Sequence, residues 1–147
     1  MYPIVRLTKE VLNARQKPPL HPLGHHVSWH RCWPQDIDNY LEMNNGRILT
    51  ILDIGRGGLA QRTGLLDALR ANRWGLTIAG SSVRYRKRIR PFAKFRTVSR
   101  SVGWGRRFFY LEQTIWLGDD CAVQGLFRAA VTDRNGCLLY TSDAADD

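Results

Sequence analysis

The spacing of apolar and polar positions changes along this 147-residue chain. Residues 25–33, HHVSWHRCW, alternate at every second position and are rich in aromatic side chains, which predicts a strand. After Asn44, the period lengthens to that of a helix with one buried face, whose stripe comprises Ile48, Ile51, Leu52 and Gly55. Residues 65–73, LLDALRANR, predict a second and shorter helix.

Three glycines near the end of the longer helix, Gly55, Gly57 and Gly58, leave two interpretations open. Glycine lowers helix propensity, so the helix could end there. Alternatively, the missing side chains let the backbone approach another part of the molecule closely.

The region from Trp74 to Asp133 shows no helical periodicity and predicts four strands in an antiparallel meander. Turn-forming stretches at RPF, GWG and LGDD separate the segments WGLTIAGSSVRYRKRI, FAKFRTVSRSV, RRFFYLEQTIWL and CAVQGLFRAAVT. A sheet of this kind has one apolar face to cover, and the long helix is the natural partner. The predicted fold class is therefore α+β.

The chain has the size of one domain, and its 44% hydrophobic content is sufficient for a core. Residues 1–24 begin with a short helical pattern and end in KPPLHPLG, so we predict an N-terminal arm before a domain at residues 25–136. No apolar run reaches the roughly 18 residues of a spanning helix, and the start of the chain lacks a signal-peptide pattern. We therefore expect a cytoplasmic protein with no membrane segment.

The last segment, CLLYTSDAADD at residues 137–147, is small and acidic after a basic, aromatic-rich chain. One choice of codons for it matches the transposon-end adapter of a sequencing library, so we predict a non-native tail. The natural sequence after Gly136 would then be missing, and a genuine polar tail is the alternative. Without the three aspartates of this segment, 22 Lys and Arg face 10 acids, which raises the formal net charge from +9 to +12.

This charge suits an anionic partner: a nucleic acid, anionic lipid headgroups or a phosphorylated ligand. Outside the tail, Cys32 and Cys121 show no CxxC spacing, which argues against a zinc site and a disulfide framework. The four histidines, all between residues 21 and 30, have no acid partner at a metal-ligand spacing. We therefore predict no metal site.

Residues 36–47, DIDNYLEMNNGR, hold the candidate chemistry. Asn44 or Asn45 is suited to cap the long helix. In the simplest interpretation the asparagines only cap, the two aspartates are loop acids near the positive end of the helix, and Glu42 faces solvent. Alternatively, amides at the helix start polarise a carbonyl oxygen while an upstream carboxylate acts on the carbonyl carbon, which makes an acyl-transfer site.

Several blocks of residues 2–136, taken in order, resemble the acyl-CoA thioesterases of the hotdog fold, in particular a bacterial thioesterase-like branch. These blocks are DID (36–38), MNNGR (43–47), ILTILDIGR, NRWGLTIAGSSVRYRKRIRPF (72–92), GWGRRFFYLEQTIW (103–116) and RAAVTDRNG (128–136). The resemblance implies a five-stranded antiparallel sheet wrapped around one long helix. It also implies a homodimer, alone or as a dimer of dimers, that binds acyl-CoA across the subunit interface and needs no cofactor.

The resemblance assigns the nucleophile or general base to Asp38, the second acid of the D-x-D motif, and the amide that polarises the thioester carbonyl to the region of Asn45. Many relatives have histidine where this chain has Glu42. Glu42 is then a second general base, a like charge that disfavours ionisation of Asp38, or a residue without a catalytic role. The favoured function is hydrolysis of acyl-CoA to free acid and CoA. A non-catalytic module that binds acyl-CoA is the alternative.

The basic stretch RYRKRIR at residues 84–90 is a candidate phosphate site. Alternation along a strand would place four guanidinium groups on one face, where they could hold the phosphates of CoA. These residues are Arg84, Arg86, Arg88 and Arg90. A solvated strand face and a nucleic-acid surface are the alternatives, and the absence of an RNA-binding signature disfavours the latter.

Overall fold

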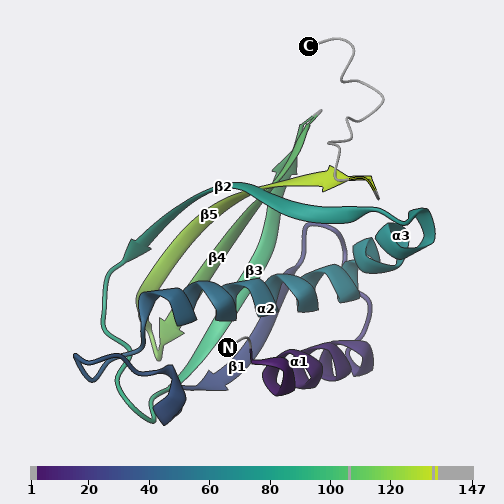
Figure 1. Cartoon of the computed structure of the whole chain (residues 1–147). Helices are drawn as coiled ribbons and strands as arrows, with labels where there is room; N and C mark the ends of the chain where they lie inside the picture. The colour runs from purple at the N-terminus through teal and green to yellow at the C-terminus, as the bar shows by residue number, and fades with distance from the viewer. Residues whose placement is uncertain (1–2, 106, 134, 136–147) are drawn as a thin grey trace.

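The structure, a computed structural model, describes residues 3–105, 107–133 and 135. One five-stranded antiparallel sheet is covered on one face by a long helix (Figure 1). The strands are β1 (His25–Arg31), β2 (Gly75–Tyr85), β3 (Lys94–Trp104), β4 (Phe108–Leu117) and β5 (Asp120–Thr132). The helices are α1 (Ile4–Gln16), α2 (Asn45–Thr63) and α3 (Leu65–Asn72), with a 3-10 turn η1 at Pro34–Asp36. The predicted α+β class is confirmed.

The strand order differs from the predicted meander. It is β1-β3-β4-β5-β2, so β2 pairs with β5, β1 pairs with β3, and β1 and β2 form the two edges. The meander prediction is wrong for β2 because residues 86–93, between β2 and β3, do not form a tight hairpin turn. This longer connection crosses the end of the sheet and passes close to the start of α2.

α2 supplies the centre of the core. The predicted stripe is buried, and it packs against side chains of β3, β4 and β5, including Phe95, Ile115 and Val123. The helix continues through the three glycines to Thr63, so close approach is the interpretation that holds. A Cβ at Gly58 would collide with the side chains of His26 and Glu10.

α1 is longer than the short helix predicted in residues 1–24. It packs against α2 beside the edge strand β1 and buries Glu10 and Ala14 (Figure 1). This docking is hard to predict because one of the two buried positions is a glutamate, and a charged residue does not mark a buried face in a sequence pattern. Within the described residues, no helix is long and apolar enough to cross a bilayer.

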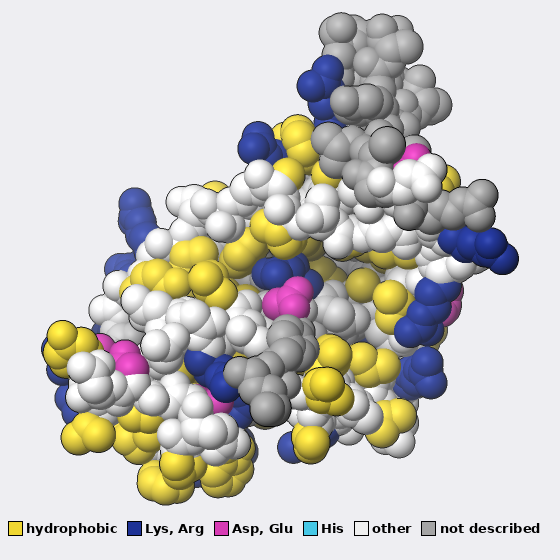
Figure 2. All heavy atoms as spheres, in the orientation of Figure 1, with side chains coloured by type: hydrophobic (Ala, Val, Ile, Leu, Met, Phe, Trp, Pro, Cys, Tyr) yellow, Lys and Arg dark blue, Asp and Glu magenta, His cyan; other side chains and the backbone are white. Residues whose placement is uncertain are grey.

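The alternating pattern of β1 is inverted relative to a common amphipathic strand. His26 and Ser28 face α2 and are buried, whereas Trp29 points away and is 55% exposed. The aromatic members of the pattern therefore lie on the surface. Basic side chains are widely spread over the face that Figure 2 shows and acidic ones are few, in keeping with the net charge of +9.

Candidate active site at the start of the long helix

The first turn of α2 has one unused amide. Asn44 is the N-cap, and its Oδ1 accepts hydrogen bonds from the amides of Gly46 (2.7 Å) and Arg47 (3.3 Å). The amide of Ile48 donates to the Asn44 carbonyl at 3.0 Å. Within the described residues, the amide of Asn45 has no hydrogen-bond partner. It is therefore the donor of this turn that a ligand could reach.

Asp36 is a buried carboxylate with a structural role. Arg6 of α1 donates to both of its oxygens, at 3.2 and 2.8 Å, and Arg47 of α2 lies 3.2 Å from Oδ1. The amide of Trp33 donates to Oδ2 at 3.0 Å. Because its hydrogen-bonding capacity is taken up by these groups, Asp36 fastens η1 to both helices and is poorly placed to act as a nucleophile.

Asp38 has a very different environment in the tight loop between η1 and α2. Its amide donates to the Glu42 carbonyl at 2.9 Å, and its carbonyl accepts from Leu41 at 3.1 Å. Its Oδ1 accepts from the Tyr40 amide at 2.9 Å. Within the described residues, Oδ2 has no hydrogen bond or ion pair. Of the two acids in the D-x-D pair, Asp38 is therefore the one whose carboxylate keeps an oxygen available to a ligand.

Glu42 is held by an arginine. Its Oε2 lies 3.2 Å from Nε of Arg88, and the two side chains are 26% and 69% exposed. The pair links the Asp38 loop to the connection between β2 and β3. Ion pairs at this exposure contribute little to stability, about 0–1 kcal/mol.

The four arginines of residues 84–90 do not share a strand face. β2 ends at Tyr85, and beyond it the buried Ile89 accepts a hydrogen bond on its carbonyl from the Met43 amide at 2.8 Å. This tie to the loop before α2 turns the backbone out of the sheet, so the predicted alternation is wrong past β2. All four side chains are nevertheless exposed: Arg84, Arg86, Arg88 and Arg90.

A hollow of about 470 Å³ lies beside the start of α2. Its lining comprises Gln35, Asp36, Ile37, Asn44, Gly46, Arg47 and Thr50. Asp38, Glu42 and Asn45 are outside this lining, so this hollow does not enclose the three predicted catalytic residues. Among the described residues, no cluster of His, Cys, Asp and Glu could hold a metal ion.

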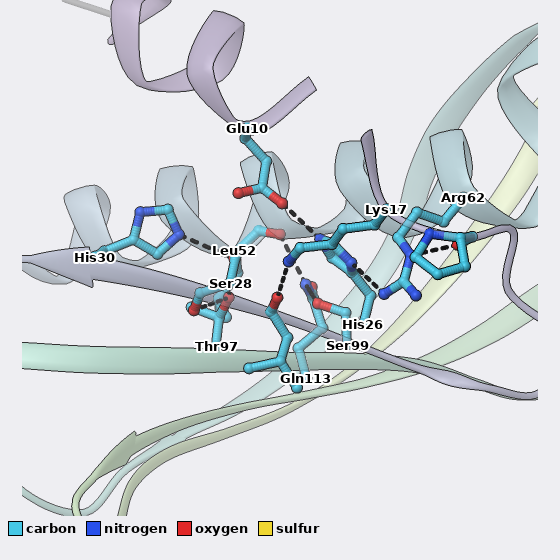
Figure 3. A network of polar contacts seen from close by, with 12 residues as sticks. Glu10, Lys17, His26, Ser28, His30, Leu52, Arg62, Thr97, Ser99 and Gln113 are labelled. Carbon is cyan, nitrogen blue, oxygen red and sulfur yellow. Dashed lines mark hydrogen bonds and ion pairs between the residues drawn. The ribbon is translucent and has the colours of Figure 1, made fainter. Parts of the chain in front are cut away.

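A second polar cluster lies between α2 and the sheet (Figure 3). Gln113 donates to the Leu52 carbonyl and to Ser99 Oγ, both at 2.8 Å, and accepts from Arg56 at 2.8 Å. Each polar group of the Gln113 amide is thereby used, as burial requires. This part of the cluster is therefore part of the folded core.

The same cluster joins α1 to β1 through Glu10 and His26. His26 Nε2 lies 2.5 Å from Glu10 Oε1, and Arg62 lies 3.2 Å from Nδ1 on the other side of the ring (Figure 3). Arginine can only donate, so Nδ1 must accept and Nε2 must carry the proton that Glu10 receives as a hydrogen bond. The pair anchors α1 to the sheet.

Among the described residues, His30 has a strongly lowered pKa. Burial lowers its pKa from 6.5 to about 4, opposed by the charge of Glu10 and assisted by that of Arg6. Its Nε2 lies 3.1 Å from Ser28 Oγ. The ring is therefore uncharged at neutral pH.

Stability should fall on mild acidification because of His30. The unfolded chain takes up the proton near the ordinary pKa of 6.5, whereas the folded chain resists it until about 4. The contribution of neutral His30 to the free energy of unfolding is fully present above pH 6.5 and is lost as pH falls towards 4. By about pH 5 the free energy of unfolding should drop by about 2 kcal/mol.

Urea unfolding at neutral pH and at about pH 5 measures this loss in the native chain and in His30→Phe. The variant should lose about 2 kcal/mol less than the native chain, while His25→Gln, at an exposed position of the same strand, should behave like the native chain. Equal pH dependence in all three proteins would contradict the prediction.

Comparison with known proteins identifies the family. The model of the thioesterase-like superfamily matches residues 32–144. Protein THEM6 of Xenopus laevis is 33% identical over 112 residues, which cover 75% of this chain and 54% of that protein. Protein THEM6 of Drosophila melanogaster is 37% identical over 83 residues, 56% of this chain and 43% of that protein. The chain thus spans about half the length of these relatives, and their animal origin gives no support to a bacterial source.

Solved structures agree on the fold. A "Probable Thioesterase" from Bartonella henselae superposes with a TM-score of 0.73 at 16% identity, covering 80% of this chain and 98% of that one. A DHNA-CoA thioesterase from Staphylococcus aureus gives a TM-score of 0.70 at 12% identity, covering 79% and 80%. At these identities the likeness establishes the fold alone. With a hotdog fold and a family match over most of its length, this chain belongs to the thioesterase-like superfamily.

Proposed function

We propose that the chain hydrolyses an acyl-CoA thioester to a free acid and CoA, with Asp38 as nucleophile or general base. The observation that carries this proposal is the contrast between the two acids of the D-x-D motif. Asp36 is locked by two arginines, whereas Asp38 keeps one carboxylate oxygen without a partner in the described residues. The helix that follows begins at Asn45, whose amide has no hydrogen-bond partner in the described part of the chain.

The chemistry needs one carboxylate and one amide. As a nucleophile, Asp38 attacks the thioester carbon and expels CoA thiolate, and water then hydrolyses the mixed anhydride. As a general base, it removes a proton from water that attacks the same carbon. In either route the Asn45 amide stabilises the oxyanion, a contribution of about 10²–10³ in rate for one such donor.

A homodimer would complete this site. The edge strand β2 has exposed positions along most of its length, including Ile78 and Tyr85, and its outer edge has no neighbour in the described part of the chain. A second copy could cover this strand and close the space over Asp38. We propose that acyl-CoA binds between the two copies.

The exposed arginines at the end of β2 and just past it are candidates for the CoA phosphates. Arg88 is already paired with Glu42, so Arg84, Arg86 and Arg90 are better placed to accept an added anion. Guanidinium groups bind phosphate oxygens through paired hydrogen bonds, and they do not require a shared strand face to do so.

Release of free thiol from a panel of short, long, branched and aromatic acyl-CoAs tests the proposal. Turnover of at least one substrate by a folded dimer would support it. Binding of CoA without turnover would instead favour a non-catalytic acyl-CoA module, which the replacement of the relatives' histidine by Glu42 makes the principal alternative. Tight binding of an oligonucleotide that weakens steeply with salt and resists competition by CoA would contradict both.

Glu42→Gln should change the hydrolysis rate only slightly, by roughly fivefold or less, because Glu42 is neutralised by Arg88 and contributes mainly an exposed ion pair. Arg88→Gln is the matched variant, since it removes the same pair from the other side. Steady-state rates should be similar in the two variants. A loss of 100-fold or more in Glu42→Gln alone, the size expected for a general base, would transfer the catalytic role to Glu42.

A further inference from the structure

A groove of about 910 Å³ separates α1 from the edge strand β1. Six basic and two acidic side chains line it, and both acids already have partners: Asp36 with two arginines and Glu10 with His26. The groove therefore carries an excess of four positive charges. Within the described residues, four of its cations have no carboxylate partner: Lys9, Lys17, Arg31 and Lys94.

β1 directs a free backbone edge towards this groove. At the end of the strand, Cys32 bonds in the direction of β3: its amide donates to Ala93 at 2.9 Å, and its carbonyl accepts from Phe92 at 2.7 Å. Backbone groups in an antiparallel ladder face the neighbouring strand at every second residue. The even-numbered residues of β1 therefore bond to β3, and the odd-numbered ones point their amides and carbonyls away from it.

Two side chains from α1 and its C-terminal end occupy part of this free edge. Lys17 Nζ donates to the Val27 carbonyl at 2.9 Å, and Arg6 Nη2 donates to the Arg31 carbonyl at 3.3 Å. Trp29 lies between these positions and also lines the groove. By the same alternation its amide and carbonyl face the groove, at the spacing of a strand that could receive another.

We propose that this groove binds an extended acidic peptide segment of a partner protein, which adds as a strand to β1 opposite Trp29. Amides of the incoming segment would replace Lys17 and Arg6 at the carbonyls of Val27 and Arg31. The released Lys17 then pairs with a carboxylate of the segment in a charge-assisted contact, whereas Arg6 keeps its ion pair with Asp36. Ile4 and Val5 of α1 line the groove and are 67% and 85% exposed. They would contact apolar side chains of the bound segment.

The free strand edge is what favours a peptide over a nucleic acid. A nucleic acid would need only the lysines and arginines, which bind phosphates, and the exposed tryptophans, on which bases stack. It would make no use of the backbone edge of β1. A row of outward amides and carbonyls matches another polypeptide backbone, and an exposed edge of this kind is the usual place for strand addition. The proposal is independent of hydrolysis at Asp38.

Fluorescence polarisation with a short labelled peptide of alternating Glu and Thr tests the charge requirement. The native protein should bind it and should bind the corresponding Lys peptide much more weakly. Lys9→Glu should weaken binding, whereas Arg70→Glu, the same charge change at an exposed position of α3, should not. Equal effects of the two substitutions would mean general charge attraction and would overturn a specific groove.

Two substitutions of Trp29 test strand addition. Both Trp29→Ala and Trp29→Pro remove the indole, but only proline removes the amide that faces the groove. Because that amide lies outside the β1–β3 ladder, an edge strand can accept proline there. We expect Trp29→Pro to bind roughly tenfold more weakly than Trp29→Ala, the effect of one lost hydrogen bond.

Equal affinity of the alanine and proline variants would overturn the proposal. So would undiminished binding of a peptide methylated on alternate backbone nitrogens, or stronger binding of a single-stranded oligonucleotide that competes with the peptide. If Trp29→Pro does not fold, hydrogen exchange on the native protein decides. Bound peptide should protect the amides of Val27, Trp29 and Arg31, while that of Ser28 should already be protected. Unchanged exchange at these three amides at saturating peptide would exclude strand addition.

Discussion

Replacing Asp38 by asparagine should lower the hydrolysis rate of the best acyl-CoA substrate by about 10²–10⁴-fold, the usual cost of removing a general base. The substitution keeps the size of the side chain, and an asparagine Oδ1 can still accept from the Tyr40 amide as the carboxylate does. The loop should therefore keep its shape, and the loss should reflect charge alone. Thiol release at saturating substrate measures it.

Asp36→Asn is the informative counterpart, because it makes the same chemical change two residues away. Asp36 is buried between Arg6 and Arg47, so its neutralisation should lower the melting temperature, whereas Asp38→Asn should leave it nearly unchanged. If Asp38→Asn kept full activity at matched folded concentration, Asp38 would be excluded as the catalytic acid. Glu42 would then be the next candidate.

The helices and most strand segments could be predicted because their signals are local. Apolar spacing located the buried face of α2, and turn-forming residues separated the strands. Pairing is not local. The sequence cannot show that β2 joins β5 at the far edge, because the length of the 86–93 connection permits more than one neighbour.

Buried polar side chains are a second reason why parts of the fold could not be predicted from the sequence. The inner face of β1 carries His26 and Ser28, and α1 buries Glu10, so the usual equation of buried with apolar fails at these positions. Each of these groups is satisfied by a partner on another element, such as Glu10 for His26. A partner that is distant in the sequence leaves no spacing signal.

The candidate site could be located from the sequence, but the different environments of Asp36 and Asp38 could not be predicted. The motif places Asp36 and Asp38 before the helix, and their residue types are identical. What distinguishes them is Arg6, thirty positions upstream of Asp36, together with Arg47 from the first turn of α2. The Asn45 amide belongs to the backbone, so no residue type marks it in the sequence. Only the structure shows that it lacks a hydrogen-bond partner within the described residues, because the Asn44 side chain accepts from the next two amides.

Gly58→Ala should destabilise the protein by about 2–4 kcal/mol, although alanine is the better helix former. A Cβ at this position would meet His26 Nε2 and Glu10 Oε1, which are buried and bonded to each other. Relieving the collision takes the Nε2 proton of His26 away from the Glu10 carboxylate, and a buried charge left without its partner costs about 3–5 kcal/mol. The gain in helix propensity, about 1 kcal/mol, offsets only part of this. Urea unfolding at neutral pH measures the difference.

Gly57→Ala supplies the matched control, one residue earlier on the same helix. Its Cβ would lie 3.9 Å from the Leu7 side chain, an ordinary van der Waals distance. This substitution should therefore stabilise the protein by about 0.5–1 kcal/mol. The effect of helix propensity is the same at both glycines. If the two substitutions change the free energy of unfolding in opposite directions, the difference must come from the close approach of α2 to the Glu10–His26 pair. Stabilisation by both substitutions would mean that α1 and β1 can move away from α2 at little cost, and that the pair does not anchor α1.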